Sequence, residues 1–246
     1  MICMKANGNT VLITGGATGI GLELAGAFID AGSEVIVCAR SEENLKQAKD
    51  KFPKLHTRKC DVSKEAEREV LYEWAVSNFK DLNILVNNAG IQRMIDFKKG
   101  TVDLLRHKME DGEDEIEVNL RAPIYLTALF TPHLIKQKEA AIMNVSSGLA
   151  FYPMPQLPVY CSTKAAMHTF SLILRQQLEG TSVKVFELIP PMVDTNLDKG
   201  ARKARGQTYF GITTAELVKP AMKSFEKDEY EIRVQDPDLA ARMGHR

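Results

Sequence analysis

Short, almost continuously apolar runs alternate with longer stretches of mixed polarity along nearly the whole chain. Such runs are typical of strands buried on both faces of a parallel sheet, whereas the mixed stretches have the spacing of helices with one apolar side. The runs predict strands at residues 10–14, 34–38, 55–59, 83–86, 140–145 and 183–188, with a last candidate at 230–234. The stretches between them predict helices from the glycines after residue 14 to about 31, at 41–52, at 63–79, within 101–137, at 158–179 and at 214–225.

The alternation of strands and helices indicates an α/β fold. Consecutive parallel strands need crossover connections, and these are right-handed, so helices cover both faces of the sheet. We therefore expect a doubly wound parallel sheet of the Rossmann type, in three α/β/α layers. Because no linker-like or low-complexity stretch divides the chain, we expect a single domain over residues 1–246.

Local signals set several boundaries of these helices. Ser41 and Ser63 are expected N-caps, because a serine hydroxyl can accept a hydrogen bond from the free backbone N–H groups at a helix start. Pro53 is expected to end the helix that begins after Ser41. Asp111-Gly112 predicts a break within residues 101–137.

Two segments are expected to border a substrate. Residues 192–213 have little periodicity and are rich in Gly, Lys and Arg, so we expect a substrate loop there; the alternative is a solvated surface connection. Residues 151–158 are apolar and stiffened by proline, which predicts part of a substrate wall or, alternatively, a rigid surface turn.

Composition narrows the function classes. Of the 246 residues, 44% are apolar and 26% are charged, with 32 acidic and 32 basic residues. The zero net charge gives no reason to expect nucleic acid or an anionic membrane as a partner. No apolar run reaches the length of a membrane span and no signal-peptide core is visible, so we expect a cytoplasmic protein with reduced cysteines. The cysteines and the histidines at 107, 133 and 168 lack metal-ligand spacing, so no metal site is expected.

A glycine-rich turn follows the first predicted strand. Thr14-Gly-Gly-Ala-Thr-Gly-Ile-Gly21 opens the first helix. Glycines let the backbone approach a pyrophosphate closely, and the helix N-terminus supplies N–H groups and positive potential. Because the turn lies between the first strand and helix of an α/β pattern, it predicts a dinucleotide site. The alternative is a turn whose glycines serve packing alone.

The end of the second strand bears on the choice of nicotinamide cofactor. A site specific for NAD usually has an acid there, which binds the 2′-hydroxyl of the ribose. This strand ends Cys38-Ala-Arg-Ser41, without an acid. Arg40 is suited to pair with a 2′-phosphate through charge-assisted hydrogen bonds, which favours NADP(H) over NAD(H). The alternative for Arg40 is a solvated side chain at a helix start.

A tyrosine and a lysine four residues apart suggest proton-transfer chemistry. Tyr160 and Lys164 lie in a predicted helix, so both side chains lie on one face. A neighbouring ammonium favours the phenolate, and we therefore expect the pKa of Tyr160 to fall toward working pH. Ser147 follows an apolar strand, where its hydroxyl could hold a substrate oxygen. Ser146 would point to the opposite side, because successive strand residues alternate.

The ordered motifs resemble those of the single-domain short-chain dehydrogenase/reductase family over nearly the whole chain. The motifs that carry the resemblance are the glycine turn at 14–21, Asp61-Val62, Asn87-Asn-Ala-Gly90, Asn119, Ser147, Tyr160-x-x-x-Lys164 and Pro190 to Thr195. The stretches at 144–150 and 190–195 are similar, more narrowly, to those of the DltE-type bacterial oxidoreductases within that family.

The resemblance implies catalytic roles for four residues. Tyr160 would be the general acid/base, and Lys164 would hold the nicotinamide ribose and lower the pKa of the tyrosine. Ser147 would orient the substrate oxygen. Asn119 would anchor a water that passes protons to Lys164; the alternative is an ordinary helix residue that bonds locally.

The resemblance also implies a cofactor site along the carboxyl ends of the strands. The residues expected to bind the cofactor are Gly15, Thr18, Gly19, Ile20, Arg40, Asp61, Val62, Asn88, Ala89, Gly90, Tyr160, Lys164, Pro190, Val193 and Thr195. Asp61 would contact the adenine, or is simply an acid at a helix start. Val193 and Thr195 would bind the nicotinamide carboxamide.

These observations predict an NADP(H)-dependent oxidoreductase that transfers a hydride between the nicotinamide and a small carbonyl or alcohol substrate. Pro191 stands where the family usually has glycine, so no substrate is carried over from relatives. Two other functions stay open: a nucleotide-dependent sensor on an inactive scaffold of this family, and a sugar-nucleotide epimerase-like enzyme, which would need a larger segment after Thr195. We expect a homodimer or homotetramer formed through the helices at 101–137 and 158–179.

Overall fold

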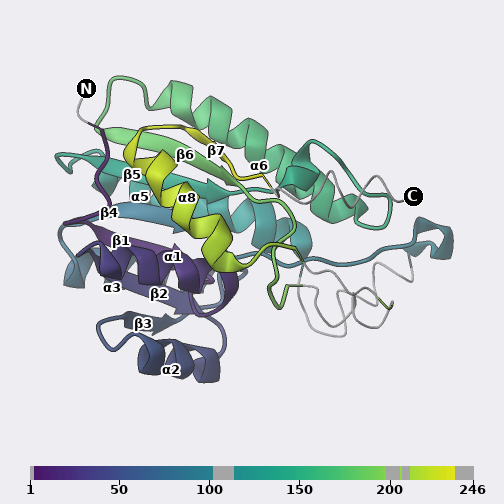
Figure 1. Ribbon diagram of the computed structural model, residues 1–246, viewed down its shortest axis with the longest axis horizontal. Coiled ribbons are helices and arrows are strands. Elements are labelled where there is room, and N and C mark those ends of the chain that lie inside the picture. The colour runs from purple at the N-terminus through teal and green to yellow at the C-terminus, as the bar shows by residue number, and fades with distance from the viewer. Residues whose placement is uncertain (1–2, 102–113, 198–205, 207–210, 236–246) are drawn as a thin grey trace.

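Seven parallel strands form one sheet in the computed structural model, which describes residues 3–101, 114–197, 206 and 211–235. The strands are β1 (Thr10–Thr14), β2 (Glu34–Ala39), β3 (His56–Lys59), β4 (Leu82–Asn87), β5 (Ala140–Val145), β6 (Val183–Ile189) and β7 (Glu231–Arg233). Their order is β3-β2-β1-β4-β5-β6-β7. The chain thus builds outward from β1 to β3, then returns to the other side of β1 with β4 (Figure 1). This reversal confirms the doubly wound sheet and leaves a crevice at the carboxyl ends of β1 and β4.

Helices cover both faces of this sheet (Figure 1). One face carries α1 (Gly19–Asp30), α2 (Glu42–Lys51) and α8 (Thr214–Glu226), and the other carries α3 (Glu65–Asn78), α5 (Ala122–Leu134) and α6 (Pro158–Gln177). Short helical segments lie at Phe97–Lys99, Glu117–Arg121 and Gly148–Ala150. The three layers agree with the predicted architecture.

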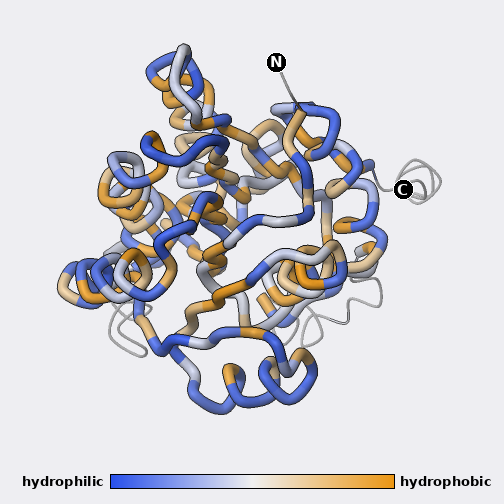
Figure 2. Tube along the Cα trace, turned by 90° about the vertical axis from the view of Figure 1, so that its left-hand side faces the viewer, coloured by the Kyte–Doolittle hydropathy of each residue, from blue (hydrophilic) through white to orange (hydrophobic). Residues whose placement is uncertain are grey.

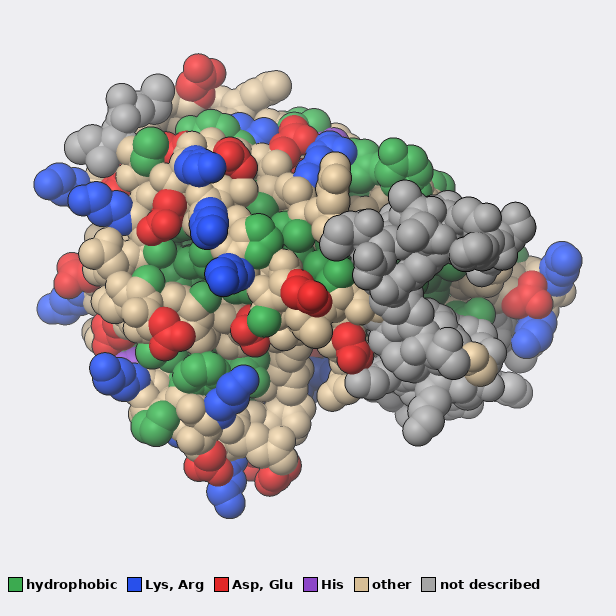
Figure 3. Space-filling model, viewed as in Figure 1, with side chains coloured by type: hydrophobic (Ala, Val, Ile, Leu, Met, Phe, Trp, Pro, Cys, Tyr) green, Lys and Arg blue, Asp and Glu red, His purple; other side chains and the backbone are tan. Residues whose placement is uncertain are grey.

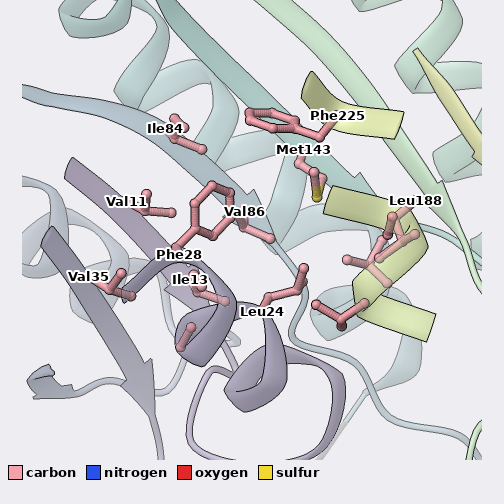
Figure 4. Packing of buried hydrophobic residues seen from close by; sticks show 14 of the residues in the cluster. Val11, Ile13, Leu24, Phe28, Val35, Ile84, Val86, Met143, Leu188 and Phe225 are labelled. Atoms are coloured by element: carbon pink, nitrogen blue, oxygen red, sulfur yellow. The ribbon is translucent and has the colours of Figure 1, made fainter. Parts of the chain in front are cut away.

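Side chains of alternating direction along the strands build two hydrophobic cores. Val11 and Ile13 of β1 point to the face covered by α1 and α8, where they pack near Phe28 and Phe225 (Figure 4). Leu12, between them, points to the face covered by α3, α5 and α6. The strands therefore read as continuous apolar runs because both of their faces are buried. Figure 2 shows the same division, with hydrophobic residues concentrated inside the trace and hydrophilic residues on its outer turns.

The helix caps agree only in part with those predicted from the sequence. The Ser41 hydroxyl accepts a hydrogen bond from the Asn44 N–H at 3.1 Å, so the predicted N-cap of α2 is confirmed. The predicted cap at Ser63 is wrong, because α3 begins after Lys64. Ser63 instead donates from both its N–H and its hydroxyl to Asp61 Oδ1, at 3.0 and 2.7 Å. This turn stabilises the chain just before the helix rather than at its first residue.

The helix predicted within residues 101–137 has an irregular start. Residues Glu117–Arg121 form a π-helical turn that leads directly into α5. The predicted break at Asp111-Gly112 lies outside the described residues.

Within the described residues, no helix combines the length and the apolar character needed to cross a bilayer. Figure 3 shows acidic and basic side chains interspersed over the face in view, as the balanced composition suggests.

Candidate active site

A cavity of about 670 Å³ lies at the carboxyl edge of the sheet, at the point where the strand order reverses. In open α/β sheets this crevice is the usual ligand site. Its lining includes fourteen of the residues expected at the cofactor: Gly15, Thr18, Gly19, Ile20, Arg40, Asp61, Val62, Asn88, Ala89, Gly90, Tyr160, Lys164, Pro190 and Thr195. One continuous space therefore connects the glycine turn with the tyrosine and the lysine.

The glycine turn forms one wall of the cavity, and its close packing leaves no room for a larger side chain at Gly15. Gly15 has a φ of +61°, and a Cβ atom added there would lie 2.9 Å from the Ala89 Cα. The Asn88 side chain braces the turn by donating to the carbonyls of Thr14 and Gly15, at 2.9 and 3.1 Å. The first turn of α1 then directs its free N–H groups toward the cavity, which suits a phosphate.

The far end of the cavity is lined by polar residues that follow β2 and β3. Arg40, Ser41 and Asn44 lie after β2, and Asp61 lies after β3. Asp61 accepts the two hydrogen bonds from Ser63, and its Oδ2 lies 3.8 Å from Lys64 Nζ. The carboxylate of Asp61 thus also orders its own loop.

Tyr160 keeps its proton more firmly than the sequence suggests. The residue is 6% exposed on α6, and this burial raises the pKa of Tyr160 to about 12, whereas a hydrogen bond with the Ser147 side chain acts in the opposite direction. The expectation of a lowered pKa is wrong for this structure, because loss of hydration outweighs any benefit from the neighbouring lysine. The phenol is held in its acid form.

Lys164 experiences the same loss of hydration. Its Nζ donates to the Val145 carbonyl at 2.9 Å and lies 5.6 Å from the centre of the Tyr160 ring. Burial lowers the pKa of Lys164 to about 8. The ammonium and the neutral amine are therefore both accessible near neutral pH.

The two serines after β5 make different contacts, and Ser146 rather than Ser147 is among the residues that line the cavity. Ser147 accepts a hydrogen bond from the Leu149 N–H at 3.1 Å and is within hydrogen-bonding reach of Tyr160. Ser146 donates from its N–H to the Leu188 carbonyl at 2.9 Å, which attaches it to β6. Ser147 is thus the serine next to the phenol.

Asn119 fastens the loop that follows β4. It lies in the π-helical turn and is 1% exposed. Its Oδ1 accepts from the Ile91 N–H and its Nδ2 donates to the Ile91 carbonyl, both at 2.8 Å. A Cβ atom added at Gly90 would lie 3.4 Å from Asn119 Oδ1 and 3.7 Å from Lys164 Nζ, so the three residues meet at one point.

Val193 is the expected cofactor residue that the structure turns away from the cavity. Its side chain is buried in the core on the α1 and α8 face, and its backbone pairs with Ile212. The Asp194 N–H donates to the Ile212 carbonyl at 2.8 Å, and the Ile212 N–H donates to the Met192 carbonyl at 3.0 Å. These bonds pin the base of the 192–213 segment, whose residues 198–205 and 207–210 lie outside the described residues. Thr195, two residues further, does reach the cavity.

Sequence reasoning missed a buried acid beside the site. Glu115 is 5% exposed, its Oε1 accepts from the Arg93 N–H at 2.8 Å, and burial raises the pKa of Glu115 to about 7. Glu115 and Asn119 are four residues apart, and their side chains bind the backbone of Arg93 and Ile91 in the loop after β4. Their four-residue spacing, which places them on one side of a helix, is the signal by which the sequence could have indicated Glu115.

Metal ligands do not gather at this site. Across the described ranges, no group of three or more His, Cys, Asp or Glu side chains is placed to hold a metal ion. The polar groups of the cavity are instead hydroxyls, amides, two thiols, one phenol, the carboxylate of Asp61 and a few cations. Such groups suit an organic ligand with phosphates.

Comparison with known proteins agrees with this geometry. The short chain dehydrogenase family matches residues 9–206. The chain is 56% identical over 229 residues to a protein named "Uncharacterized oxidoreductase DltE" from Bacillus subtilis (strain 168), covering 93% of this chain and 89% of that protein. It is 32% identical over 209 residues to the NADP-dependent 3-hydroxy acid dehydrogenase YdfG of Salmonella typhi, covering 82% of each.

A solved structure gives the same result. The closed form of a serine dehydrogenase complexed with NADP+ superposes with a TM-score of 0.78 at 29% identity, covering 91% of this chain and 92% of that one. The strand order, the cavity at its reversal and these similarities lead to one conclusion. The chain belongs to the short-chain dehydrogenase family and is an oxidoreductase of the DltE type.

Proposed function

We propose that the protein is an NADP(H)-dependent oxidoreductase that interconverts a small carbonyl compound and its alcohol, with Tyr160 as the general acid/base. The observation that carries this proposal is the single cavity that connects the glycine turn and Arg40 at one end with Tyr160 and Lys164 at the other. A dinucleotide is an elongated ligand with a phosphate group in its middle, and these residues offer matching chemistry along the cavity.

The residues of the cavity fit such a cofactor. Gly15 and the start of α1 would hold the pyrophosphate, because both line the cavity and the first turn of α1 offers free N–H groups there. Arg40 would pair with the 2′-phosphate of NADP(H), and the end of β2, Cys38-Ala-Arg-Ser41, carries no acid to favour the 2′-hydroxyl of NAD(H). The relatives described above support a nicotinamide cofactor, and the preference for NADP(H) rests on Arg40.

The bound nicotinamide supplies the hydride, and the protein supplies position and the proton. Tyr160 retains its proton because it is buried, so it is suited to donate that proton to a carbonyl oxygen during reduction. Ser147, next to the phenol, would hold the same oxygen. Lys164, with its Nζ near the phenol ring, would bind the ribose and return a proton to the site. Asn119 would serve this return through a water.

The substrate would enter beside the segment at 151–158. Tyr152 and Met154 of this segment are exposed, which supports a substrate with an apolar part. Thr195 and Leu197, in the described part of the 192–213 segment, line the cavity, which supports this segment as a border of the substrate space. Exposed apolar residues on α5 and α6, such as Tyr125 and Ile173, support association of two or four copies of the chain.

The experiment that tests this function is the substitution Tyr160→Phe. Loss of the acidic hydroxyl should reduce kcat for carbonyl reduction by about 10²-fold to 10⁴-fold, whereas the Kd for NADPH should stay unchanged. Tyr72→Phe is the matched control, since Tyr72 of α3 is not among the cavity-lining residues and its ring packs against Phe130. Retained turnover in Tyr160→Phe would remove Tyr160 from its role.

A further inference from the structure

A row of buried polar side chains crosses the sheet behind the active site. Asn87 of β4, Asn144 of β5 and Glu187 of β6 are register partners, and each is at most 3% exposed. Asn87 Nδ2 donates to Asn144 Oδ1 at 2.9 Å, and Asn144 Nδ2 donates to Ser171 Oγ of α6 at 2.9 Å. A row of this kind is costly to bury unless its members are paired.

Glu187 is the charged member of this row and, like Asn144, is fully buried. Its exposure is 0%, and its Oε2 lies 2.8 Å from His168 Nδ1 of α6. A carboxylate can only accept, so His168 donates from Nδ1. The other oxygen, Oε1, has no hydrogen-bond partner among the described residues. A carboxylate that is half satisfied at such depth needs a further source of stabilisation, and a nearby positive charge is one.

Lys164 is that nearby charge. It precedes His168 by one turn of α6, and its Nζ binds the carbonyl of Val145, the residue after Asn144. Because Asn144 and Glu187 are register partners, the ammonium contacts β5 one residue beyond the point where this strand pairs with Glu187 of β6. Burial lowers the pKa of Lys164 to about 8, and the negative charge of Glu187 opposes this decrease.

We propose that Glu187 is a positioning residue of the active site, whose carboxylate is the counter-charge that keeps Lys164 in its ammonium form, and that His168 holds this carboxylate in place. The inference deepens the proposed function and rests on it, because an ammonium at Lys164 is what would bind the ribose and stand ready to return a proton. Neither Glu187 nor His168 lines the cavity, so both act through Lys164.

Other ionisable groups near Glu187 already have different partners. Arg175 of α6 donates to the carbonyls of Val185 and Tyr230. On β7, Glu231 is the register partner of Glu187, but it is exposed and pairs with Arg233 at 3.0 Å. These contacts leave His168 and Lys164 as the ionisable groups that α6 presents to the buried carboxylate, together with Tyr160 on the cavity side of Lys164.

The test measures the protonation of Lys164 directly, without relying on turnover. Only the neutral amine reacts with acetic anhydride, so the rate of Lys164 acetylation against pH, followed by mass spectrometry of its peptide, gives its titration midpoint. The exposed Lys138 serves as an internal reference. In Glu187→Gln this midpoint should fall by about one pH unit, and the alkaline limit of kcat/KM should fall with it. The glutamine keeps the shape and can still accept from His168, so the fold should persist.

Three further variants separate charge from structure. Glu231→Gln removes the same charge one strand away and should leave the midpoint unchanged. Glu187→Asp keeps the charge, so the titration midpoint of Lys164 should stay close to that of the native protein. His168→Leu removes the donor that holds the carboxylate in place, so the Lys164 midpoint should fall, but by less than in Glu187→Gln.

An unchanged Lys164 midpoint in Glu187→Gln, or an equal fall in Glu231→Gln, would overturn the inference. If Glu187→Gln does not fold, an unchanged midpoint in His168→Leu would do the same. Failure of the proposed function would look different: Tyr160→Phe would keep its turnover, whereas the acetylation midpoint of Lys164 would still respond to Glu187.

Discussion

Tyr160 and Lys164 are both removed from water, and this loss of hydration disfavours the charged form of each side chain. The phenol therefore keeps its proton up to a pKa of about 12, and the lysine releases its proton at about 8. Reduction needs a proton donor at the carbonyl oxygen, and a buried neutral phenol meets this need. The site thus favours reduction near neutral pH, and we expect its alkaline limit to follow Lys164 rather than Tyr160.

The burial of Lys164 should also lower the stability of the protein. Its pKa is about 8 when folded and 10.5 in the unfolded chain, so the unfolded chain binds more protons between these values. Stability should therefore rise as the pH increases from 8 to 10.5, and below pH 8 the buried ammonium costs about 3 kcal/mol at about 1.4 kcal/mol per pKa unit. Lys164→Met should gain stability near pH 7, lose this pH dependence and lose activity.

Chemical denaturation at pH 7 and pH 10 checks this prediction. The control is Lys138→Met, which removes an exposed lysine and should change stability little at either pH. If Lys164→Met is no more stable than the native protein at pH 7, the account of its burial is wrong.

Arg40 should determine the choice of cofactor. If its guanidinium pairs with the 2′-phosphate, Arg40→Ala should weaken NADPH binding by about tenfold to a hundredfold, because a hydrogen bond to a charged group contributes about 1.5–3 kcal/mol. Binding of NADH should change little. Fluorescence titration with both cofactors measures this, with Lys59→Ala as the control, an exposed cation that pairs with Glu42 outside the cavity. Equal losses for both cofactors would contradict the assignment.

Among the elements, the turn between β1 and α1 constrains the cofactor site most tightly. Gly15 combines a left-handed φ with a neighbouring backbone that leaves no space for a Cβ atom. Gly15→Ala should therefore destabilise the protein and weaken NADPH binding at least tenfold. Gly32→Ala separates the two causes, since Gly32 also has a positive φ but nothing lies near its Cβ position. It should cost about 1–2 kcal/mol of stability and leave binding intact. Normal NADPH binding by Gly15→Ala would argue against this turn as the phosphate site.

The elements also show how far local sequence signals reach. The strands, the glycine turn and the cap at Ser41 depend on neighbouring residues, so the sequence predicts them. Ser63 has the residue type of a cap, but hydrogen bonding to Asp61 takes its hydroxyl. The π-helical turn that carries Asn119 has no local sequence signature, and the backbone of Ile91, to which the Asn119 side chain bonds, lies 28 residues away in the sequence.

At the scale of the whole molecule, one sheet separates two cores and joins them through the same strands. Because β1 contributes Ile13 to one core and Leu12 to the other, neither core can form without the sheet. We propose on this basis that residues 1–246 form a single domain.

The single tryptophan, Trp74, packs against the core beneath α3 and α5, so its fluorescence reports that core alone. Its thermal transition should coincide with that of the far-UV circular dichroism signal, and NADPH should raise both. Two separate transitions would indicate independent units.

Contacts between residues far apart in the sequence could not be predicted from the sequence. His168 has no acidic neighbour in the sequence, yet folding places it 2.8 Å from Glu187. The pKa of Tyr160 depends in the same way on burial, which periodicity does not quantify. Motif spacing predicted most of the residues that line the cavity, but Asn119, Ser147 and Val193 are not among them. For Val193 the reason is that spacing does not determine which way the chain turns after Pro190.

Transfer of deuterium from labelled NADPH to a carbonyl substrate is the most direct test of the whole account. With NADPH deuterated at the transferring position of the nicotinamide, the native protein should place the label on the carbinol carbon of the alcohol, as detected by mass spectrometry. Tyr160→Phe should bind the same labelled cofactor and form almost no labelled alcohol. Absence of label from the native product across a panel of aldehydes and ketones, or undiminished labelling by Tyr160→Phe, would contradict the central claim.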